Sequence, residues 1–251
     1  MRYYRGLVSS DWSECLSPSG PFDFMSFVYP ELRQALATIF RQYTGNELAL
    51  SEAMQRCRGL LPAPITTDQM DAYLDERFSV YTGVPELIEA CLSRQILFMI
   101  NTTGSMGYFQ RAFYKKLLPR IPVLSAYPGL MFPAGESDPE ILFDLQEIAD
   151  KPLNTQKAAK HFQIPPQNIL IMGDSGGDGP HFKWAAEWKV VRVASMAKPS
   201  LKTYCAGEQV GIDHFFGISY EDGEPRRESD EMAVDFRELV PFISDCLGDG
   251  E

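Results

Sequence analysis

Segment 169–178 constrains the fold of this chain most. It reads Ile-Leu-Ile-Met-Gly-Asp-Ser-Gly-Gly-Asp. Four consecutive apolar residues predict a buried strand, and a Gly-Asp turn opens at its carboxyl end, where open α/β sheets place their ligands. Asp174 and Asp178 on one tight turn can both face a hard cation such as Mg²⁺, which prefers oxygen ligands. Gly and Asp are also common in solvated turns that bind nothing, so the turn alone favours neither interpretation.

The composition indicates a globular protein with an acidic surface. The 251 residues are 45% hydrophobic, which suffices for one large domain or for a core with a smaller companion. The formal net charge of −11 argues against binding to a nucleic-acid backbone, which requires a basic face. An anionic substrate therefore needs a local cation or basic side chains inside a cleft.

The cysteines and the apolar segments indicate the compartment. The five cysteines are widely spaced and form no Cys-x-x-Cys pair, which is typical of reduced thiols. No segment approaches the roughly 18 apolar residues of a membrane-spanning helix, and the first residues lack the apolar stretch of a signal peptide. We therefore expect a cytoplasmic protein without a membrane partner.

A helical block follows a first short strand. Residues 6–10 predict a strand that delivers Asp11 to a turn. Between about 28 and 81 apolar residues recur at helical spacing, and Ser51 and Thr67 are expected as N-caps of two helices. We expect this block to be a small all-helical unit inserted after the first strand. The apolar stripes comprise Leu32, Leu36, Ile39, Phe40 and Tyr43, and then Met70, Tyr73, Leu74 and Tyr81.

The rest of the chain alternates between helices and strands. A helix over 84–92 runs into the strand 96–100, and a helix over 154–163 precedes the strand 169–172. We therefore expect the α/β class, with a Rossmann-like parallel sheet flanked by helices. The other expected elements are a strand over 190–193, an exposed charged loop over 221–231 and a last helix over 236–246.

Polar residues follow the ends of the predicted strands in a definite order. Asp11 follows the first strand, Thr102 the second, Lys151 comes next, and Asp174 and Asp178 follow a later strand. This order resembles the haloacid dehalogenase-like hydrolase superfamily, most members of which are Mg²⁺-dependent phosphatases. The resemblance spans almost the whole chain.

The resemblance also implies a division into domains. The core would comprise residues 1–16 and 84–251, and residues 17–83 would form a helical cap of the C1 type. Such a cap closes over the site and selects the substrate, which is expected to be a small phosphorylated molecule. Neither a nucleic acid nor a membrane is expected as a partner.

Asp11 and Lys151 are the catalytic residues that the resemblance implies. The Asp11 carboxylate would attack phosphorus and form an aspartyl-phosphate, which splits hydrolysis into two easier steps. Lys151 would bind the substrate and stabilise charge on the nucleophile and on the transferring phosphoryl group. We expect Lys151 to precede its helix, whereas Lys157 and Lys160 lie within it.

The threonines and the acidic turn complete the implied site. Thr102 and Thr103 would bind a phosphoryl oxygen, and Thr102 is preferred because it leaves Thr103-Gly104 at the small-residue positions that often follow the hydroxyl in the family. Which threonine points inward is open from the residues alone. A Mg²⁺ ion would be held by Asp11, by position 13 and by the two aspartates of the turn, Asp174 and Asp178.

Position 13 departs from the family. The first motif of its phosphatases is usually Asp-x-Asp-Gly-Thr, and the second Asp acts as acid and then as base. This chain has Ser13 there, followed by Glu14 and Cys15. A serine hydroxyl cannot protonate a leaving alkoxide as a carboxylic acid does, and loss of a general acid costs on the order of 10²–10⁴-fold in rate.

Three interpretations accommodate Ser13. The first is a weak or specialised phosphatase in which Glu14, a cap residue such as Asp23, or solvent replaces the missing acid. The second is another reaction class, a dehalogenase or a phosphonatase-type hydrolase. The third is a non-catalytic module that binds metal and phosphate. We rank them in that order because the acidic turn and Lys151 are retained.

Overall fold

The chain folds around one parallel sheet. We describe it from a computed structural model that covers residues 3–44 and 47–248. The sheet has seven strands in the order β4-β3-β2-β1-β5-β6-β7, and every neighbouring pair runs parallel. The strands are β1 (Gly6–Ser10), β2 (Ile96–Ser105), β3 (Val123–Tyr127), β4 (Ile141–Asp144), β5 (Ile169–Gly173), β6 (Val191–Ser195) and β7 (His214–Phe216).

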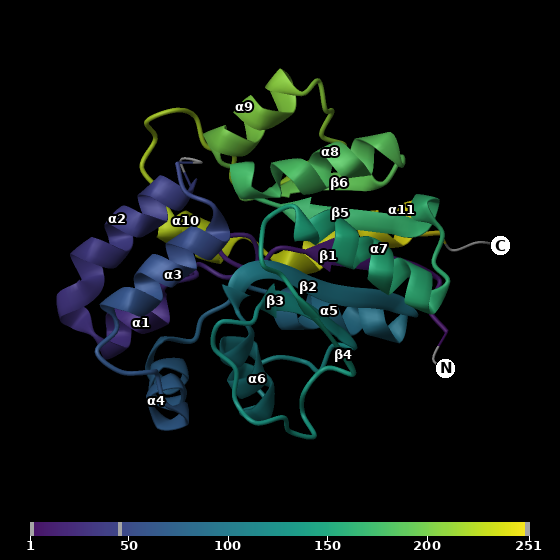
Figure 1. Cartoon of the computed structure of the whole chain (residues 1–251). Coiled ribbons are helices and arrows are strands. Elements are labelled where there is room, and N and C mark those ends of the chain that lie inside the picture. Colours follow the sequence, from purple (N-terminus) through teal and green to yellow (C-terminus); the bar gives the residue numbers. More distant parts are fainter. Residues whose placement is uncertain (1–2, 45–46, 249–251) are drawn as a thin grey trace.

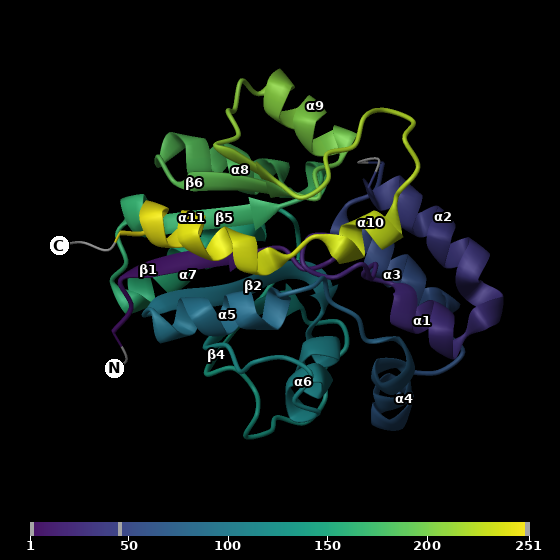
Figure 2. The same cartoon turned by 180° about the vertical axis from the view of Figure 1, so that it is seen from behind.

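Helices cover both faces of the sheet, which confirms the expected α/β class. In Figure 1 α7 (Asp150–Phe162) and α8 (Gly179–Glu187) lie in front of the strands, and Figure 2 shows α5 (Val84–Ser93) and α11 (Leu239–Cys246) on the opposite face. Leu7 and Val8, adjacent in β1, accordingly belong to different buried apolar clusters. Of the helices described, none is long and apolar enough to cross a membrane.

The strand order creates a place for a ligand. From β1 the sheet grows outwards through β2, β3 and β4 on one side and through β5, β6 and β7 on the other. Its topological switch point therefore lies between β1 and β5, where open α/β sheets bind ligands at the carboxyl ends of the strands. Asp11 continues β1, and its N–H donates to the carbonyl of Met172 in β5 at 3.0 Å.

A helical insertion stands at this end of the sheet. Between β1 and α5 lie α1 (Asp23–Val28), α2 (Arg33–Thr44), α3 (Leu50–Leu60) and α4 (Thr67–Arg77), grouped beyond the strand ends in Figure 1. A bidentate ion pair from Arg111 to Asp71, with both contacts at 2.7 Å, fixes α4 against α6 (Met106–Tyr114). The assignment of residues 17–83 as a cap domain stays a prediction.

The two predicted helix caps are wrong. Helix α4 is capped by Thr66 in a capping box with Gln69, one residue before the expected Thr67. Helix α3 has Ala49 at its N-cap, and the N–H groups of Leu50 and Ser51 donate instead to the Glu147 carboxylate at 3.0 and 3.1 Å. Since Glu147 precedes α7, a core residue caps a helix of the insertion.

Two other boundaries differ from expectation. Helix α7 starts at Asp150, so Lys151 lies in the first turn of the helix and not before it. Pro152 is tolerated in the same turn because the first N–H groups of a helix have no acceptor within the helix. The segment 221–231, expected as an exposed loop, includes the start of α10 (Glu228–Ala233), in which Glu231 is buried.

The remaining elements are α9 (Pro199–Gly207) and the 3₁₀ turns η1 (Pro30–Leu32), η2 (Pro166–Asn168), η3 (Gly176–Asp178) and η4 (Phe236–Glu238).

Glu147 offers a test of how the core supports the insertion. Glu147→Ala leaves the N–H groups of Leu50 and Ser51 without their carboxylate acceptor. We expect a loss of about 1 kcal/mol in the free energy of unfolding, as for other helix caps, which corresponds to a fall of about 2–4 °C in Tm. Differential scanning calorimetry measures it, and Glu140→Ala, at an exposed site, serves as the control. An equal effect of the two substitutions would contradict the capping role.

Candidate active site

Asp11 is held in a fixed orientation at the end of β1. Its side chain is buried, and the Trp12 N–H donates to its Oδ1 at 2.7 Å. Burial raises the pKa of Asp11 above its usual value, while the nearby Lys151 ammonium opposes that rise. Its other oxygen, Oδ2, lies 3.0 Å from Lys151 Nζ.

Lys151 joins the strand end to the acidic turn. Its side chain is only 2% exposed, and Nζ contacts Asp178 Oδ1 at 2.5 Å in addition to Asp11. Burial alone would lower the pKa of Lys151, but the two carboxylates raise it above its usual value, so the side chain stays charged. The carbonyl of Lys151 accepts a hydrogen bond from Asn101 Nδ2 at 2.8 Å, which ties α7 to β2.

The acidic turn has the compact geometry that its sequence predicts. Asp178 Oδ2 accepts hydrogen bonds from the N–H groups of Asp174, at 3.0 Å, and Ser175, at 3.3 Å. A Cβ atom at Gly173 would lie 2.5 Å from Asp178 Cγ, so only glycine fits before Asp174. The Asp178 side chain therefore folds back against its own strand and shapes the turn.

The third aspartate, Asp174, is buried without a hydrogen bond. Within the described chain neither of its carboxylate oxygens has a hydrogen-bond partner, and its one close cation is Lys198 Nζ, 2.7 Å from Oδ2. Burial raises the pKa of Asp174 to about 8 despite Lys198, and Asp178 and Asp11 add to the rise. Oδ1 therefore has no polar partner among the described residues, and Oδ2 has only the Lys198 ammonium.

The two threonines of β2 point to different surroundings. Thr103 lines the cavity that contains Asp11 and Lys151, whereas Thr102 does not. The Thr102 hydroxyl is buried and accepts the Gly104 N–H at 3.2 Å. Because the pairing of β2 with β3 shifts register between Asn101 and Ser105, strand alternation did not decide the direction of either side chain. The preference for Thr102 is therefore not supported by the geometry.

A cavity of about 890 Å³ opens over these residues. Ser13 lines it beside Asp11, and the insertion contributes Pro21, Phe40, Arg41 and Tyr43 to its wall. Asp23, which we considered as a substitute acid, does not line it; the Asp23 carboxylate accepts the Gly20 N–H at 2.7 Å and is exposed.

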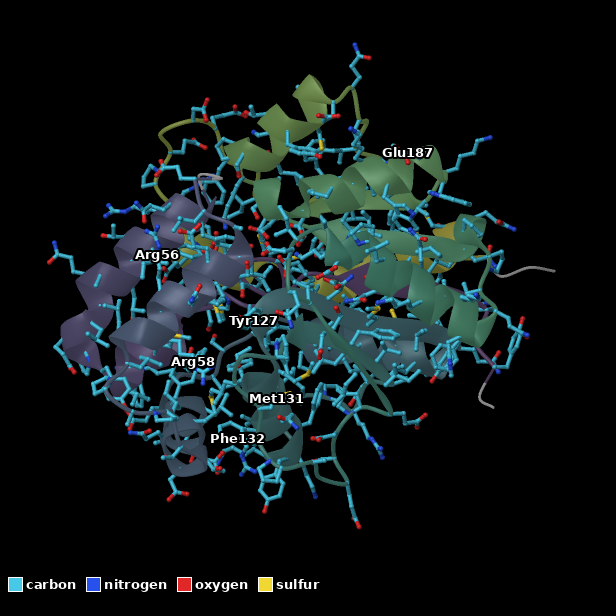
Figure 3. The ribbon with its side chains drawn as sticks, viewed as in Figure 1. Arg56, Arg58, Tyr127, Met131, Phe132 and Glu187 are labelled. Carbon is cyan, nitrogen blue, oxygen red and sulfur yellow. The ribbon has the colours of Figure 1, made fainter. Side chains whose placement is uncertain are left out.

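A second cavity lies away from this site. It has a volume of about 500 Å³ and is bounded by Arg58 of α3 and Tyr127 of β3, both labelled in Figure 3. None of the predicted catalytic, substrate-binding or metal-binding residues contributes to it.

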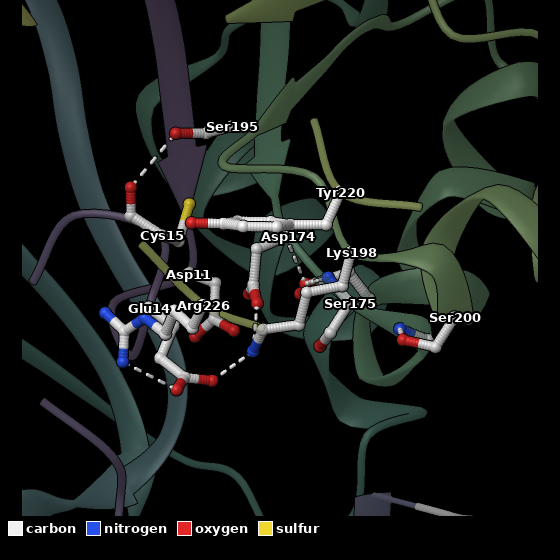
Figure 4. Close-up of polar contacts among 12 residues, drawn as sticks. Asp11, Glu14, Cys15, Asp174, Ser175, Ser195, Lys198, Ser200, Tyr220 and Arg226 are labelled. Carbon is white, nitrogen blue, oxygen red and sulfur yellow. Dashed lines mark hydrogen bonds and ion pairs between the residues drawn. The ribbon is translucent and has the colours of Figure 1, made fainter. Parts of the chain in front are cut away.

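The Glu14 carboxylate forms ion pairs with two basic side chains. Figure 4 shows its carboxylate between the Lys198 ammonium and the Arg226 guanidinium, with Arg226 Nη1 at 2.9 Å from Oε1. Lys198 also contacts Asp174, so successive ion pairs connect Asp174 of the acidic turn with Arg226 of the loop before α10. Sequence reasoning missed Lys198 and Arg226. Lys198 was detectable, because it follows the strand 191–195 at the same edge of the sheet.

Arg226 is fixed by a buried carboxylate in α10. Its guanidinium contacts Glu231 at 2.7 Å, and the hydroxyls of Tyr81 and Tyr220 donate to the same carboxylate at 2.8 and 2.7 Å. These hydrogen bonds outweigh burial and lower the pKa of Glu231, so it stays ionised. The segment before α10 is thereby anchored as one wall of the cavity.

Comparison with known proteins identifies the fold. No family model and no curated protein matches the sequence. A phosphoserine phosphatase solved as a phospho-aspartyl intermediate analogue is 16% identical, with a TM-score of 0.67 over 96% of this chain and 100% of that chain. A HAD-family hydrolase from Salmonella enterica serovar Typhi is also 16% identical, with a TM-score of 0.64 over 97% of this chain and 73% of that chain. The fold is that of the haloacid dehalogenase-like hydrolases.

In this haloacid dehalogenase-like fold the three aspartates suit a divalent cation. Asp11, Asp174 and Asp178 each offer a carboxylate oxygen, and these oxygens lie within 4.8 Å of one another. An all-oxygen set of this kind is the donor chemistry that Mg²⁺ prefers. The buried Asp174 oxygens that lack a hydrogen bond support the same fit. The residues present therefore match the metal that the fold implies.

Thermal unfolding tests this fit without reference to activity. We expect Mg²⁺ to raise Tm by several degrees, because a ligand at 100 times its Kd stabilises the folded state by about 2.7 kcal/mol. Asp174→Asn removes a ligand charge and is expected to abolish most of the rise, whereas Asp245→Asn, at an exposed position, keeps it. An undiminished rise in Asp174→Asn would place the cation elsewhere.

Proposed function

We propose that this protein is a Mg²⁺-dependent phosphohydrolase that cleaves a small phosphorylated molecule through an aspartyl-phosphate on Asp11. The observation that carries the proposal is the Lys151 ammonium between two buried carboxylates, 3.0 Å from Asp11 and 2.5 Å from Asp178, at the switch point of the sheet. The phosphoserine phosphatase structures share the fold and lend support to the reaction class.

The first step is attack by Asp11 on phosphorus. Its Oδ1 accepts the Trp12 N–H, which fixes the plane of the carboxylate and leaves Oδ2 beside Lys151. Lys151 cannot swing away, because its chain is buried and Asp178 holds it. A fixed cation beside the nucleophile stabilises the negative charge of the transferring group without reorganisation in the reaction.

The cavity supplies the remaining contacts for substrate. Thr103 is the β2 hydroxyl that lines it, so we assign the phosphoryl contact to Thr103 rather than Thr102. Asp11, Asp174 and Asp178 would hold a cation, which would supply charge neutralisation of the phosphoryl oxygens. A volume of about 890 Å³ matches a small-molecule ligand.

Turnover of an aryl phosphate tests the function. A good leaving group needs no general acid, so p-nitrophenyl phosphate is expected to be hydrolysed despite Ser13. Chelation of the metal and Asp11→Asn are each expected to abolish release of p-nitrophenol, measured by absorbance. Asp245→Asn, on the exposed surface, is the matched control and is expected to retain the rate.

Two other results would redirect the assignment. An absence of turnover over a broad panel of phosphate esters, together with normal Mg²⁺ stabilisation, would favour a non-catalytic module that binds metal and phosphate. Halide release that does not depend on Mg²⁺ would place the chain in the dehalogenase class, and release of phosphate from a phosphonate would place it with the phosphonatases.

Ser13 provides a second test. Its side chain lines the cavity next to Asp11, where the phosphatases of the family usually carry their acid. Ser13→Asp is expected to raise kcat on alkyl phosphates by at least tenfold, since a general acid contributes on the order of 10²–10⁴-fold. Rates on an alkyl and an aryl phosphate are compared in steady state. An unchanged alkyl rate would show that position 13 does not reach the leaving group.

A further inference from the structure

The second cavity lies between the insertion and the core. Its volume of about 500 Å³ falls within the range of roughly 300–1,000 Å³ that is typical of small-molecule sites. The insertion lines it from α1, from α3 and from the segment 61–65, and the core lines it from the ends of β2 and β3 and from the segment 129–130. Among the described residues it shares no lining residue with the cavity over Asp11. A ligand bound here would therefore be distinct from the substrate of the proposed reaction.

Hydrogen bonds hold both walls of the second cavity. On the core side the Leu130 carbonyl accepts the Gly107 N–H at 2.8 Å and the Ser105 hydroxyl at 3.2 Å. On the insertion side the Tyr29 hydroxyl donates to the Ala63 carbonyl at 3.1 Å. The walls are thus fixed by the protein itself, so that binding requires little additional ordering of the chain.

Most of the lining of the second cavity is apolar. Phe24, Met25 and Met54 are largely buried side chains of α1 and α3 that border it, and the core adds the Tyr127 ring, labelled in Figure 3. The thioethers of methionines adapt their shape to a neighbour and make favourable contacts with aromatic rings. An apolar group in the cavity would remove the remaining accessible part of these side chains from water, which is favourable.

Arg58 is the one charged residue in the described lining of this cavity. It is exposed, and within the described chain its guanidinium forms no hydrogen bond or ion pair. Its neighbour on α3, Arg56, pairs with Glu52 at 2.7 Å, and in the first cavity Arg226 contacts Glu231 at 2.7 Å. The second cavity therefore carries one positive charge that no described side chain compensates.

We propose that the second cavity binds a small organic carboxylate with an apolar body, whose carboxylate pairs with Arg58. A guanidinium matches a carboxylate in bidentate geometry. One guanidinium balances a monoanion, whereas a phosphate dianion would bring a second charge against apolar walls, which is costly. The Gln55 amide and the Tyr127 hydroxyl line the same cavity and can donate further hydrogen bonds. Because the lining comes from both units, the ligand would contact the insertion and the core together.

Binding of naphthaleneacetate to the full chain tests the site. Isothermal titration calorimetry is expected to show one saturable site for this acid. Its neutral amide lacks the charge and acetate lacks the apolar body, so both are expected to bind about tenfold more weakly or worse, since hydrogen bonds to charged groups are the strong ones.

Two variants locate the binding. Arg58→Met keeps an unbranched apolar stem and removes the charge, so it is expected to weaken binding of naphthaleneacetate by about tenfold or more. Arg56→Met is the matched control, because Arg56 is an exposed arginine of the same helix that does not line the cavity. It is expected to bind as the wild type does, since an exposed ion pair such as that with Glu52 contributes little.

Each outcome supports or overturns the site. Selective weakening in Arg58→Met, together with weaker binding of the amide, supports it. Equal binding of acid and amide, or equal losses in the two variants, would overturn the pairing with Arg58. A lower Tm of Arg58→Met with unchanged affinity would show that Arg58 serves only the carboxyl end of α3, in whose last turn it lies.

A lack of saturable binding by both naphthaleneacetate and octanoate would overturn the site as a whole. Hydrolysis of p-nitrophenyl phosphate is measured separately, so these results leave the proposed phosphohydrolase function untouched, and its failure would leave the carboxylate site untouched.

Discussion

The buried ion pairs of Lys151 are the constraint on which the rest of the site depends. Three carboxylates gathered in a space of 4.8 Å repel one another, and burial penalises each charge. Lys151 compensates two of them, Asp11 and Asp178, from the first turn of α7. Because those two residues follow β1 and β5, a single ammonium fixes α7 over the switch point of the sheet. Removal of one partner would leave an uncompensated buried charge, which is the costly case for ion pairs.

The charge of Asp174 is compensated by a second lysine, Lys198. Lys198 reaches it from the start of α9, and the same ammonium contacts Glu14, which Arg226 holds from the other side. Charges from four segments of the chain therefore alternate in sign along one wall of the cavity. Lys198 is only partly buried, with 29% of its side chain exposed, whereas the Lys151 side chain is 2% exposed.

The parts of the site that sequence reasoning located are those set by local patterns. An apolar run followed by Gly-Asp places Asp174 and Asp178, and Asp11 follows its strand directly. The parts it missed depend on distant partners. Glu147 caps α3 from 97 positions away, and Glu231 is buried because Arg226, Tyr81 and Tyr220 surround it. Strands β4 and β7, with four and three residues, form the two edges of the sheet and are only partly buried.

The division of labour between core and insertion explains why Ser13 need not end catalysis. In the proposed reaction the core supplies the nucleophile Asp11, the Lys151 ammonium from α7 and the three carboxylates for a cation, and none of these side chains is at position 13. The proposed attack of Asp11 on a good leaving group therefore requires side chains of the core alone, and the insertion contributes Pro21, Phe40, Arg41 and Tyr43 to the cavity wall.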